Sequence, residues 1–166
     1  MKEISSRRSI LKILLFILAA SAVLGTIFFI FHFKGAAEKS YTLQLQDTSS
    51  GKVYSKWLIG ESGKFAVEFV HSVNQSPVRE TFKIDGKMIR PHSVRFSSFG
   101  AGMDLGEGLT MNRDGDSFVL SGFDTSFRDI NYIVGTDSDH LLLINDEIVS
   151  LRDLCGRNAH ITVRIR

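Results

Sequence analysis

The chain has 166 residues, a formal net charge of +2 and one cysteine, Cys155. Six of the 20 basic and two of the 18 acidic residues precede Ser40, so the rest of the chain carries a net charge of about −2. This charge indicates no nucleic-acid footprint, and a lone cysteine excludes an internal disulfide. We therefore expect one domain of ordinary size after Ser40, with no nucleic-acid partner and no cofactor.

An uncharged apolar stretch dominates the N-terminal part of the sequence. Residues 13–31 contain no charged side chain, and at about 1.5 Å per residue a helix of this length crosses about 30 Å of hydrocarbon. We therefore predict a transmembrane helix at residues 13–33. The basic residues before it predict that residues 1–12 stay in the cytoplasm and that the chain after the helix lies outside. The protein is thus expected to span the cytoplasmic membrane once.

A cleaved signal peptide is the alternative to this membrane anchor. Ala20, Ser21 and Ala22 fit a small-x-small cleavage site. The apolar run, however, continues past this site to Phe33, where a mature secreted protein is expected to turn polar. The sequence therefore favours an uncleaved signal-anchor.

Two small residues within the predicted span are candidates for helix packing. Ser21 and Gly25 lie four residues apart and so share one face of the helix. Small side chains let two membrane helices approach closely, so this face can pack against another membrane helix. Such pairs are common in membrane helices, and the pattern does not identify a partner.

Alternating apolar and polar residues replace the helical pattern in residues 41–166. A short polar link, KGAAEKS, occupies residues 34–40. The alternation, with turn residues about every eight to twelve positions, is typical of β-strands. Strands are predicted at residues 41–46, 53–59, 64–71, 78–84, 87–99, 118–120, 130–134, 141–144, 148–149 and 161–166. The sequence therefore predicts an all-β extracytoplasmic domain, an antiparallel β-sandwich or partly open barrel of nine or ten strands.

Turn and cap residues separate these strands. Residues 85–86, Asp-Gly, predict a type I′ hairpin turn, in which both central residues need a positive φ, and residues 145–146, Asn-Asp, predict another turn. Pro91 predicts either an edge strand or a β-bulge. Ser150 is expected to cap a short helical turn over residues 151–155, which the following glycine ends.

His71 and Glu80 are the first candidate functional residues. Alternation places each of them on the core-facing row of its strand. With residues 72–77 as the hairpin loop, His71 faces Val78 and Glu80 faces Phe69, so the two candidates lie on a diagonal about 7–8 Å apart at the backbone. A buried carboxylate needs a partner. Two interpretations stay open, a structural pair at the end of the core and a ligand or partner site.

A glycine-rich stretch, SSFGAGMDLGEG, occupies residues 97–108. Gly100, Ala101 and Gly102 would let a ligand approach closely, and free backbone amides there can bind an anion. No lysine and no helix pattern follow, unlike in phosphate-binding and dinucleotide-binding loops. A connection between sheets is therefore the favoured interpretation, and an anion site is the alternative.

The sequence lacks the spacing of several enzyme and metal sites. Ser72 adjoins His71, but no strand-turn-helix nucleophile elbow surrounds it. Residues 112–116 resemble the start of a calcium loop, yet the glycine expected at its sixth position and the glutamate at its twelfth are missing. His71, Glu80 and His140 are suitable metal ligands but lie far apart in sequence. We therefore expect no catalytic residues, no metal site and no enzymatic activity.

Three stretches, taken in order, resemble one family of proteins. They are HSVNQSPVRETFKIDG, FSSFGAGMD and DHLLLINDEIVSLRDLCG. Together they resemble the uncharacterised DUF-type family of small bacterial extracytoplasmic proteins often encoded beside TAXI-type TRAP transporters, and the resemblance covers most of residues 41–166. Asn74 and Asp104 depart from the family's pattern. The positions that match it are His71, Ser72, Val73, Pro77, Val78, Glu80, Ser98, Phe99, Gly100, Ala101, Gly102 and His140.

The resemblance implies a setting for the protein, an extracytoplasmic accessory to a transporter whose soluble binding protein delivers organic acids or similar solutes. The expected function is a non-enzymatic, membrane-anchored accessory that contacts the membrane subunits of a TRAP transporter or their solute-binding protein. The alternative is a module that binds a small ligand or an ion with His71, Glu80 and residues 100–102. The candidate ligand-binding or partner-binding residues are His71, Ser72, Pro77, Glu80, Ser98, Phe99, Gly100, Ala101, Gly102 and His140.

Overall fold

The computed structural model describes residues 39–61, 63–72, 75–98 and 108–166. The predicted span at residues 13–33, with Ser21 and Gly25, lies outside these ranges. Within these ranges no helix combines the length and the apolar character needed to cross a membrane.

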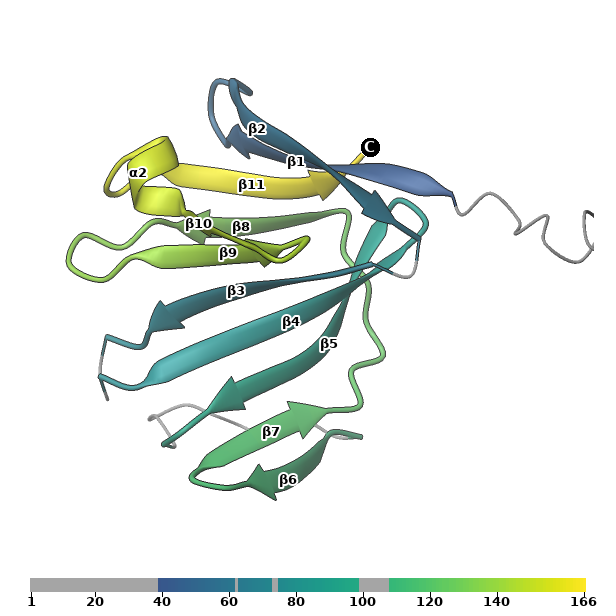
Figure 1. Ribbon diagram of the computed structural model, residues 1–166, viewed down its shortest axis with the longest axis vertical. Helices are drawn as coiled ribbons and strands as arrows, with labels where there is room; N and C mark the ends of the chain where they lie inside the picture. The colour runs from purple at the N-terminus through teal and green to yellow at the C-terminus, as the bar shows by residue number, and fades with distance from the viewer. Residues whose placement is uncertain (1–38, 62, 73–74, 99–107) are drawn as a thin grey trace, which may run out of the picture. The chain divides into compact units, whose positions relative to one another are not determined.

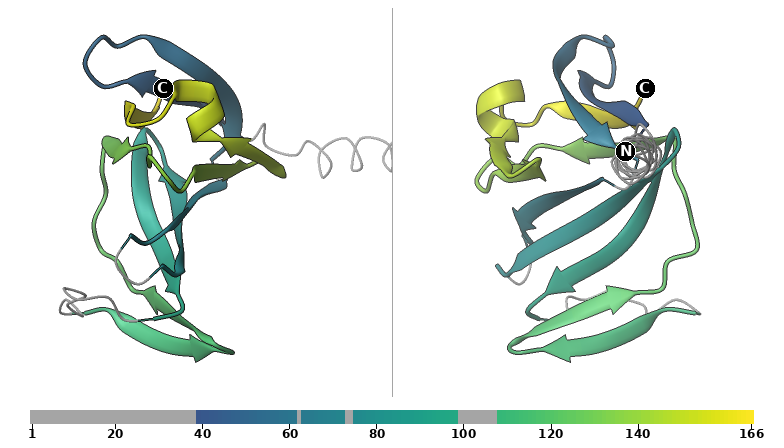
Figure 2. Two further views of the ribbon diagram at one scale, coloured as in Figure 1. Left: turned by 90° about the vertical axis from the view of Figure 1, so that its left-hand side faces the viewer. Right: turned by 45° about the vertical axis from the view of Figure 1, so that its right-hand side comes forward.

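Two antiparallel sheets make up the described part of the domain (Figure 1, Figure 2). The smaller sheet has the strand order β2-β1-β11-β8, with bounds Val53–Gly60, Ser40–Asp47, His160–Ile165 and Asp129–Ile133. The larger sheet has the order β10-β9-β3-β4-β5-β7-β6, with bounds Glu147–Ser150, His140–Ile144, Lys64–Val70, Pro77–Asp85, Met88–Phe96, Ser117–Ser121 and Thr110–Asp114. A short helix, α2 (Leu151–Cys155), follows β10. The predicted all-β class is confirmed.

The core lies between β1 and β11 of the smaller sheet and β3 and β9 of the larger sheet. Alternate residues of these strands point into it, because side chains along a strand alternate between its two faces. In Figure 1 and Figure 2, β6 and β7 lie at the far end of the larger sheet from β1, β2 and β11. The smaller sheet therefore covers only part of the larger one. The most deeply buried core residues are Leu43, Leu45, Phe65, Val67, Leu142, Ile144, Ile161 and Val163.

Ten of the strands occur where the sequence predicts them, with ends that differ by a few residues. The exception is β6, for which the sequence predicts no strand. Four of its five side chains are exposed, and it forms the edge of the larger sheet beside β7. A strand that buries no face needs no apolar alternation, so the sequence carried no signal for it.

Both predicted hairpin turns form. Type I′ geometry occurs in the turn at residues 145–146 and not in the turn after β4, where it was predicted. Asn145 and Asp146 have φ angles of 49° and 64°, as both central residues of a type I′ turn require. In the other turn Asp85 pairs with Met88, so Gly86 is the first central residue. Gly86 alone in that turn has a positive φ, 59°. The prediction of a type I′ turn after β4 is therefore wrong, because the turn lies one residue later than expected.

Pro91 marks a β-bulge, which was one of its two predicted interpretations. It lies in β5, an interior strand between β4 and β7. Pro91 pairs with Phe82 whereas Ser93 pairs with Thr81, so β5 contains one extra residue, His92, at this point. A bulge accommodates proline in an interior strand because proline has no N–H group to donate to the ladder.

The predicted helical turn is confirmed as α2. The Ser150 side chain accepts a hydrogen bond from the Asp153 N–H at 3.0 Å, and Gly156 follows with a φ of 97°. Asp139 also supports the start of the helix. Its carboxylate accepts hydrogen bonds from the Ser150 hydroxyl at 2.5 Å and the Arg152 N–H at 3.0 Å. These bonds satisfy amides that have no partner within the helix.

Several large apolar side chains are exposed on edge strands. Leu58 on β2 and Ile148 on β10 are each 70% exposed. Asn145, beside β10, donates its side-chain N–H to the Leu58 carbonyl oxygen at 2.7 Å, so the edges of the two sheets lie close together there.

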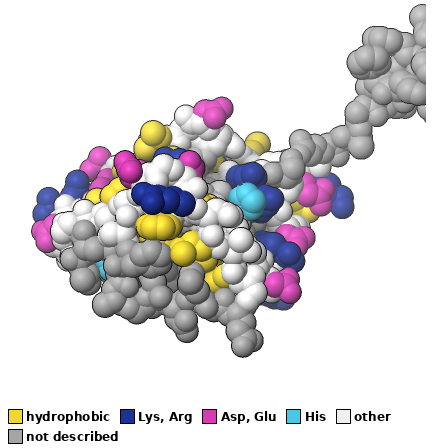
Figure 3. Space-filling view, turned by 90° about the horizontal axis from the view of Figure 1, so that it is seen from below, with side chains coloured by type: hydrophobic (Ala, Val, Ile, Leu, Met, Phe, Trp, Pro, Cys, Tyr) yellow, Lys and Arg dark blue, Asp and Glu magenta, His cyan; other side chains and the backbone are white. Residues whose placement is uncertain are grey.

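Figure 3 shows the domain from below the view of Figure 1. On this face, hydrophobic side chains gather near the centre between acidic and basic ones.

Candidate functional site

The hairpin of β3 and β4 positions Glu80, and its register differs from the predicted one. Phe69 lies opposite Val78, and Glu80 lies opposite Val67. The predicted register, with Glu80 opposite Phe69, is therefore wrong by two residues. Because side chains alternate with a period of two, this shift leaves Glu80 on its predicted inward face, in the same row as the buried Phe82.

The register also separates His71 from Glu80. The His71 N–H donates to the Ser76 carbonyl oxygen at 2.8 Å, so these two residues lie opposite each other at the end of the hairpin. Ser76 and Glu80 are four residues apart along the chain, which is about 13 Å at about 3.3 Å per residue. The predicted diagonal between His71 and Glu80, about 7–8 Å long, is therefore wrong.

Glu80 instead bonds to a tyrosine of the other sheet. The Tyr132 hydroxyl, on β8, donates to Glu80 Oε2 at 2.6 Å, and both groups are partly buried. Burial raises the pKa of Glu80 above its usual value, and the hydrogen bond from Tyr132 offsets part of this rise. Burial and the Glu80 charge raise the pKa of Tyr132 far above its usual range, so Tyr132 is a neutral donor. The bond joins the two sheets.

His140 packs beside this pair. It lies opposite Phe69 on β3, and the two rings stack with their centroids 5.0 Å apart. Its Nδ1 accepts the Gly135 N–H at 3.2 Å, which places the proton of the neutral ring on Nε2. Burial lowers the pKa of His140, and the centroid of its ring is 6.0 Å from that of Tyr132. In the described part of the chain, no group of three His, Cys, Asp or Glu residues is placed to hold a metal ion.

A second group of predicted residues meets at the end of the β3–β4 hairpin. Ser98, just after β5, bonds to the buried Ser76 with their Oγ atoms 3.3 Å apart, and Ser76 bonds to the backbone of His71. The structure thus brings His71 and Ser98 together through a residue that the sequence reasoning missed. Ser72 and Pro77 are exposed on either side of the loop. Phe99, Gly100, Ala101 and Gly102 lie outside the described residues.

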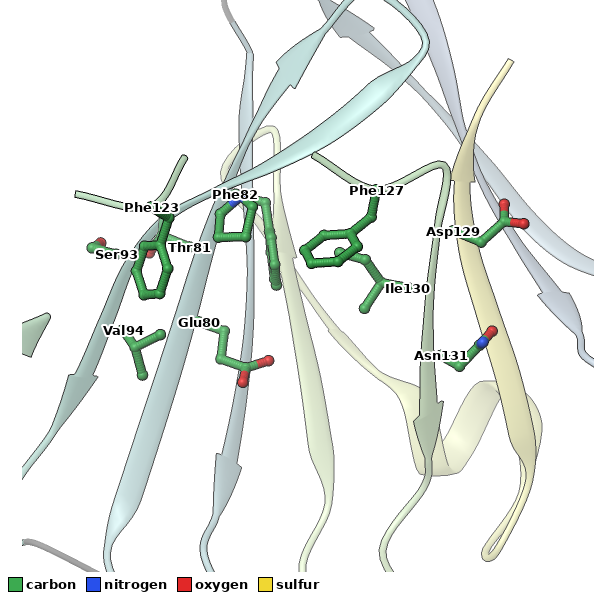
Figure 4. A pocket seen from close by; sticks show the side chains of 11 residues that line it. Glu80, Thr81, Phe82, Ser93, Val94, Phe123, Phe127, Asp129, Ile130 and Asn131 are labelled. Carbon is green, nitrogen blue, oxygen red and sulfur yellow. The ribbon is translucent and has the colours of Figure 1, made fainter. Parts of the chain in front are cut away.

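A cavity of about 360 Å³ lies between the larger sheet and β8 (Figure 4). Its walls come from β4, β5, β8 and the connection between β7 and β8, residues 122–128. Residues on both sides of the bulge at Pro91 contribute to it, as is common for bulges beside functional sites. Its main apolar side chains are Phe82, Val94, Phe123, Phe127 and Ile130.

Glu80 is the carboxylate of this cavity that faces inward. Asp129 and Asn131 also line the cavity, but in Figure 4 their side chains point away from Glu80. Asp129 forms an ion pair with Arg164 of β11 at 2.9 Å, and Asn131 accepts the Thr162 hydroxyl at 2.7 Å. Their polar groups are therefore already engaged by the smaller sheet.

The connection before β8 contributes two phenyl rings that the sequence reasoning did not select. Phe127 exchanges two backbone hydrogen bonds with Ile89, at 2.7 and 2.8 Å, which ties the connection to β5. Phe127 is nevertheless 44% exposed, so the cavity reaches the surface beside it. The available signal was FDTSF, two aromatic residues within an otherwise polar connection at residues 123–127.

One known protein family matches the part of the chain that contains these residues. Residues 65–151 match the model of a family described as a domain of unknown function, DUF1850. The chain belongs to this family. The DUF1850 region contains Glu80, Tyr132, His140 and the connection at residues 122–128. The expectation of a family of unknown function is confirmed, and its association with TRAP transporters stays a proposal. No curated protein and no solved structure matches the chain.

The raised pKa of Glu80 gives a testable dependence of stability on pH. The unfolded chain releases this proton at a lower pH than the folded chain, so the contribution of Glu80 to stability falls as the pH rises through its folded pKa. Glu80→Gln cannot ionise and still accepts the Tyr132 hydrogen bond. We expect this variant to be more stable than the unchanged protein near pH 7 and similar to it near pH 4, as measured by urea unfolding.

The fluorescence of Trp57, the single tryptophan, can follow this unfolding because Trp57 packs against the core. The matched control is Glu68→Gln, because Glu68 lies on the same hairpin but pairs with Arg79 on the exposed face. The control is expected to show no gain near pH 7. If the gain in free energy of unfolding from Glu80→Gln does not grow between pH 4 and pH 7, the prediction is contradicted.

Proposed function

We propose that the DUF1850 domain is a non-enzymatic, extracytoplasmic binding module that holds a small organic molecule in the cavity between its two sheets. The size and lining of the cavity support this proposal. Its volume, about 360 Å³, falls in the range of small-molecule sites, about 300–1,000 Å³. Such sites combine mostly apolar walls with a few polar groups that orient the ligand, and here phenyl and aliphatic groups surround Glu80.

The arrangement favours binding over catalysis. The carboxylate that faces the cavity is held by a neutral tyrosine at 2.6 Å, which orients it. Among the described residues that line the cavity, most side chains are apolar, and the hydroxyl groups are those of Thr81 and Ser93. The apolar groups supply shape and contact, and the Glu80 carboxylate is hydrogen-bonded to Tyr132 rather than to either hydroxyl.

A binding experiment with a blocked cavity tests the proposal. The full chain, reconstituted in nanodiscs of zwitterionic lipid, is titrated by calorimetry with small aromatic and aliphatic amines, alcohols and carboxylates. At least one class is expected to bind. Val94 lines the cavity, so Val94→Phe fills part of it and is expected to weaken binding about tenfold or more, since 1.4 kcal/mol corresponds to tenfold.

The matched control is Val53→Phe, because Val53 lies on β2 of the smaller sheet and is 40% exposed. This variant is expected to bind as the unchanged protein does. Empty nanodiscs correct for partition of the compounds into lipid. If no compound binds the folded protein, or if Val94→Phe binds with unchanged affinity, the proposal fails.

A role as accessory to a TRAP-type transporter is the second candidate that we propose. The resemblance of the sequence supports it, and so do Leu58 and Ile148, which are each 70% exposed on edge strands that a hydrogen bond from Asn145 brings close together. Large apolar side chains exposed on neighbouring sheet edges are candidates for a protein contact. The partner would be the membrane subunits of the transporter or their solute-binding protein.

Co-purification from membranes tests this role. The full chain is expected to carry the transporter subunits with it, and the double variant Leu58→Glu with Ile148→Glu is expected to lose them. Val53→Glu, on β2 but less exposed, is the control. Unchanged solute uptake in a strain that lacks the protein, together with no co-purification, rules against the accessory role.

A further inference from the structure

Three phenyl rings and one carboxylate meet in the cavity. Phe82 comes from β4, and Phe123 and Phe127 come from the connection before β8. In Figure 4 these rings lie side by side near the middle of the view, and Glu80 lies below them, with Val94 to its left. A ligand in the cavity therefore contacts aromatic rings and a carboxylate at the same time.

The charge of the cavity has one sign. Glu80 is its inward-facing carboxylate, and the described residues that line the cavity include no Lys, Arg or His. The second carboxylate of the lining, Asp129, is paired with Arg164 at 2.9 Å and turned away. An anionic ligand would face the Glu80 charge without a compensating cation, whereas a cationic ligand would supply one.

Within the part of the chain that the structure describes, the partly buried Glu80 carboxylate forms no ion pair. The Tyr132 hydroxyl donates to Oε2 only, and a neutral donor offsets less of the cost of desolvating a carboxylate than a cation does. Phenyl faces attract cations as well, because the ring quadrupole is negative over the face. Both features favour the same ligand charge.

We infer that the cavity binds an organic monocation, with an ammonium group at Glu80 and an apolar body against Phe82, Phe123 and Phe127. This inference rests on the proposed function, because it names the ligand class for the same cavity. It assigns two roles within the site. Glu80 selects the charge of the ligand, and the rings select its apolar body.

Three probes of similar size and different charge test the inference. They are 2-phenylethylamine, 2-phenylethanol and phenylacetate, titrated at about pH 7.5 into the full chain in zwitterionic nanodiscs. The amine is expected to bind about tenfold or more tightly than the alcohol, and phenylacetate is expected to bind more weakly than either. Glu80→Gln keeps the side-chain shape and removes the charge. It is expected to reduce the affinity for the amine to that for the alcohol and to leave the affinity for the alcohol unchanged.

The control variant is Glu68→Gln, which removes a carboxylate from the exposed face of the same hairpin and is expected to leave binding of the amine unchanged. Equal affinities for amine and alcohol, or tightest binding of phenylacetate, overturn the inference while binding in the cavity stands. Loss of amine binding in Glu68→Gln to the same extent as in Glu80→Gln also overturns it. If none of the amines, alcohols and carboxylates of the first binding experiment binds, the proposed function is wrong, and the inference is wrong with it.

Discussion

Replacing Phe65 by alanine is expected to lower the free energy of unfolding by about 3–5 kcal/mol. Phe65 is 2% exposed and lies on β3, an interior strand of the larger sheet. Its ring stacks on Phe82 with the centroids 5.1 Å apart. Alanine removes the buried ring and leaves a cavity that the surrounding strands fill only in part. Urea unfolding followed by Trp57 fluorescence measures the loss.

Phe127→Ala is the control for this prediction, because Phe127 is 44% exposed. Its ring gains less from burial, so we expect a loss of less than about half that of Phe65→Ala. Similar losses for the two variants, or a loss below about 2 kcal/mol for Phe65→Ala, would show that Phe65 does not occupy the core as described.

The second large effect is expected from Tyr132→Phe. This change removes only the hydroxyl that donates to Glu80 at 2.6 Å. Hydrogen bonds to charged groups contribute about 1.5–3 kcal/mol, and we expect a loss of stability of that size near pH 7. Because the hydrogen bond lowers the pKa of Glu80, the variant should raise that pKa further. The loss should therefore be smaller near pH 4, where Glu80 is neutral in both proteins.

A double-mutant cycle identifies the bond itself. Tyr132→Phe and Glu80→Leu, neither of which can form the hydrogen bond, are measured singly and together, and their effects should be non-additive because the two side chains share that bond. Tyr41→Phe is the matched control, since the Tyr41 hydroxyl also faces a glutamate, Glu61, but at 3.5 Å and in an exposed position. An equal loss in Tyr41→Phe and Tyr132→Phe, or additive effects in the cycle, would contradict the assignment.

The structure divides the predicted site into two places. Glu80 lines the cavity between the sheets, whereas His71 and Ser98 meet at Ser76 at the end of the β3–β4 hairpin. The register expected from the sequence differs from the observed one by two residues, which is why it placed His71 beside Glu80. Binding in the cavity is therefore tested at Glu80, and variants of His71 test the end of the hairpin separately.

Local patterns were sufficient for most of the fold. Period-two alternation and short apolar runs between turn residues predicted ten of the strands. Asn145 and Asp146 predicted their turn, since these residues tolerate a positive φ, and Ser150 predicted the start of α2. Only β6, with almost no buried side chain, had no pattern to reveal it.

The candidate site was less predictable because its contacts are distant in sequence. Tyr132 is 52 residues from Glu80 and belongs to the other sheet. Phe123 and Phe127 lie in a connection between strands, where no periodicity distinguishes a ring that lines a cavity from one in solvent. The backbone bonds between Phe127 and Ile89 place these rings, and they depend on how the two sheets pack.

The sequence by itself determined that Glu80 points inward, because the alternation of side chains depends only on position along the strand. It did not determine what Glu80 faces. A slip of two residues between β3 and β4 preserves every inward side chain, so alternation cannot distinguish the two registers. Only the packing of the larger sheet against β8 decided that Glu80 meets Tyr132 beside an apolar cavity, about 13 Å along the hairpin from the position of His71.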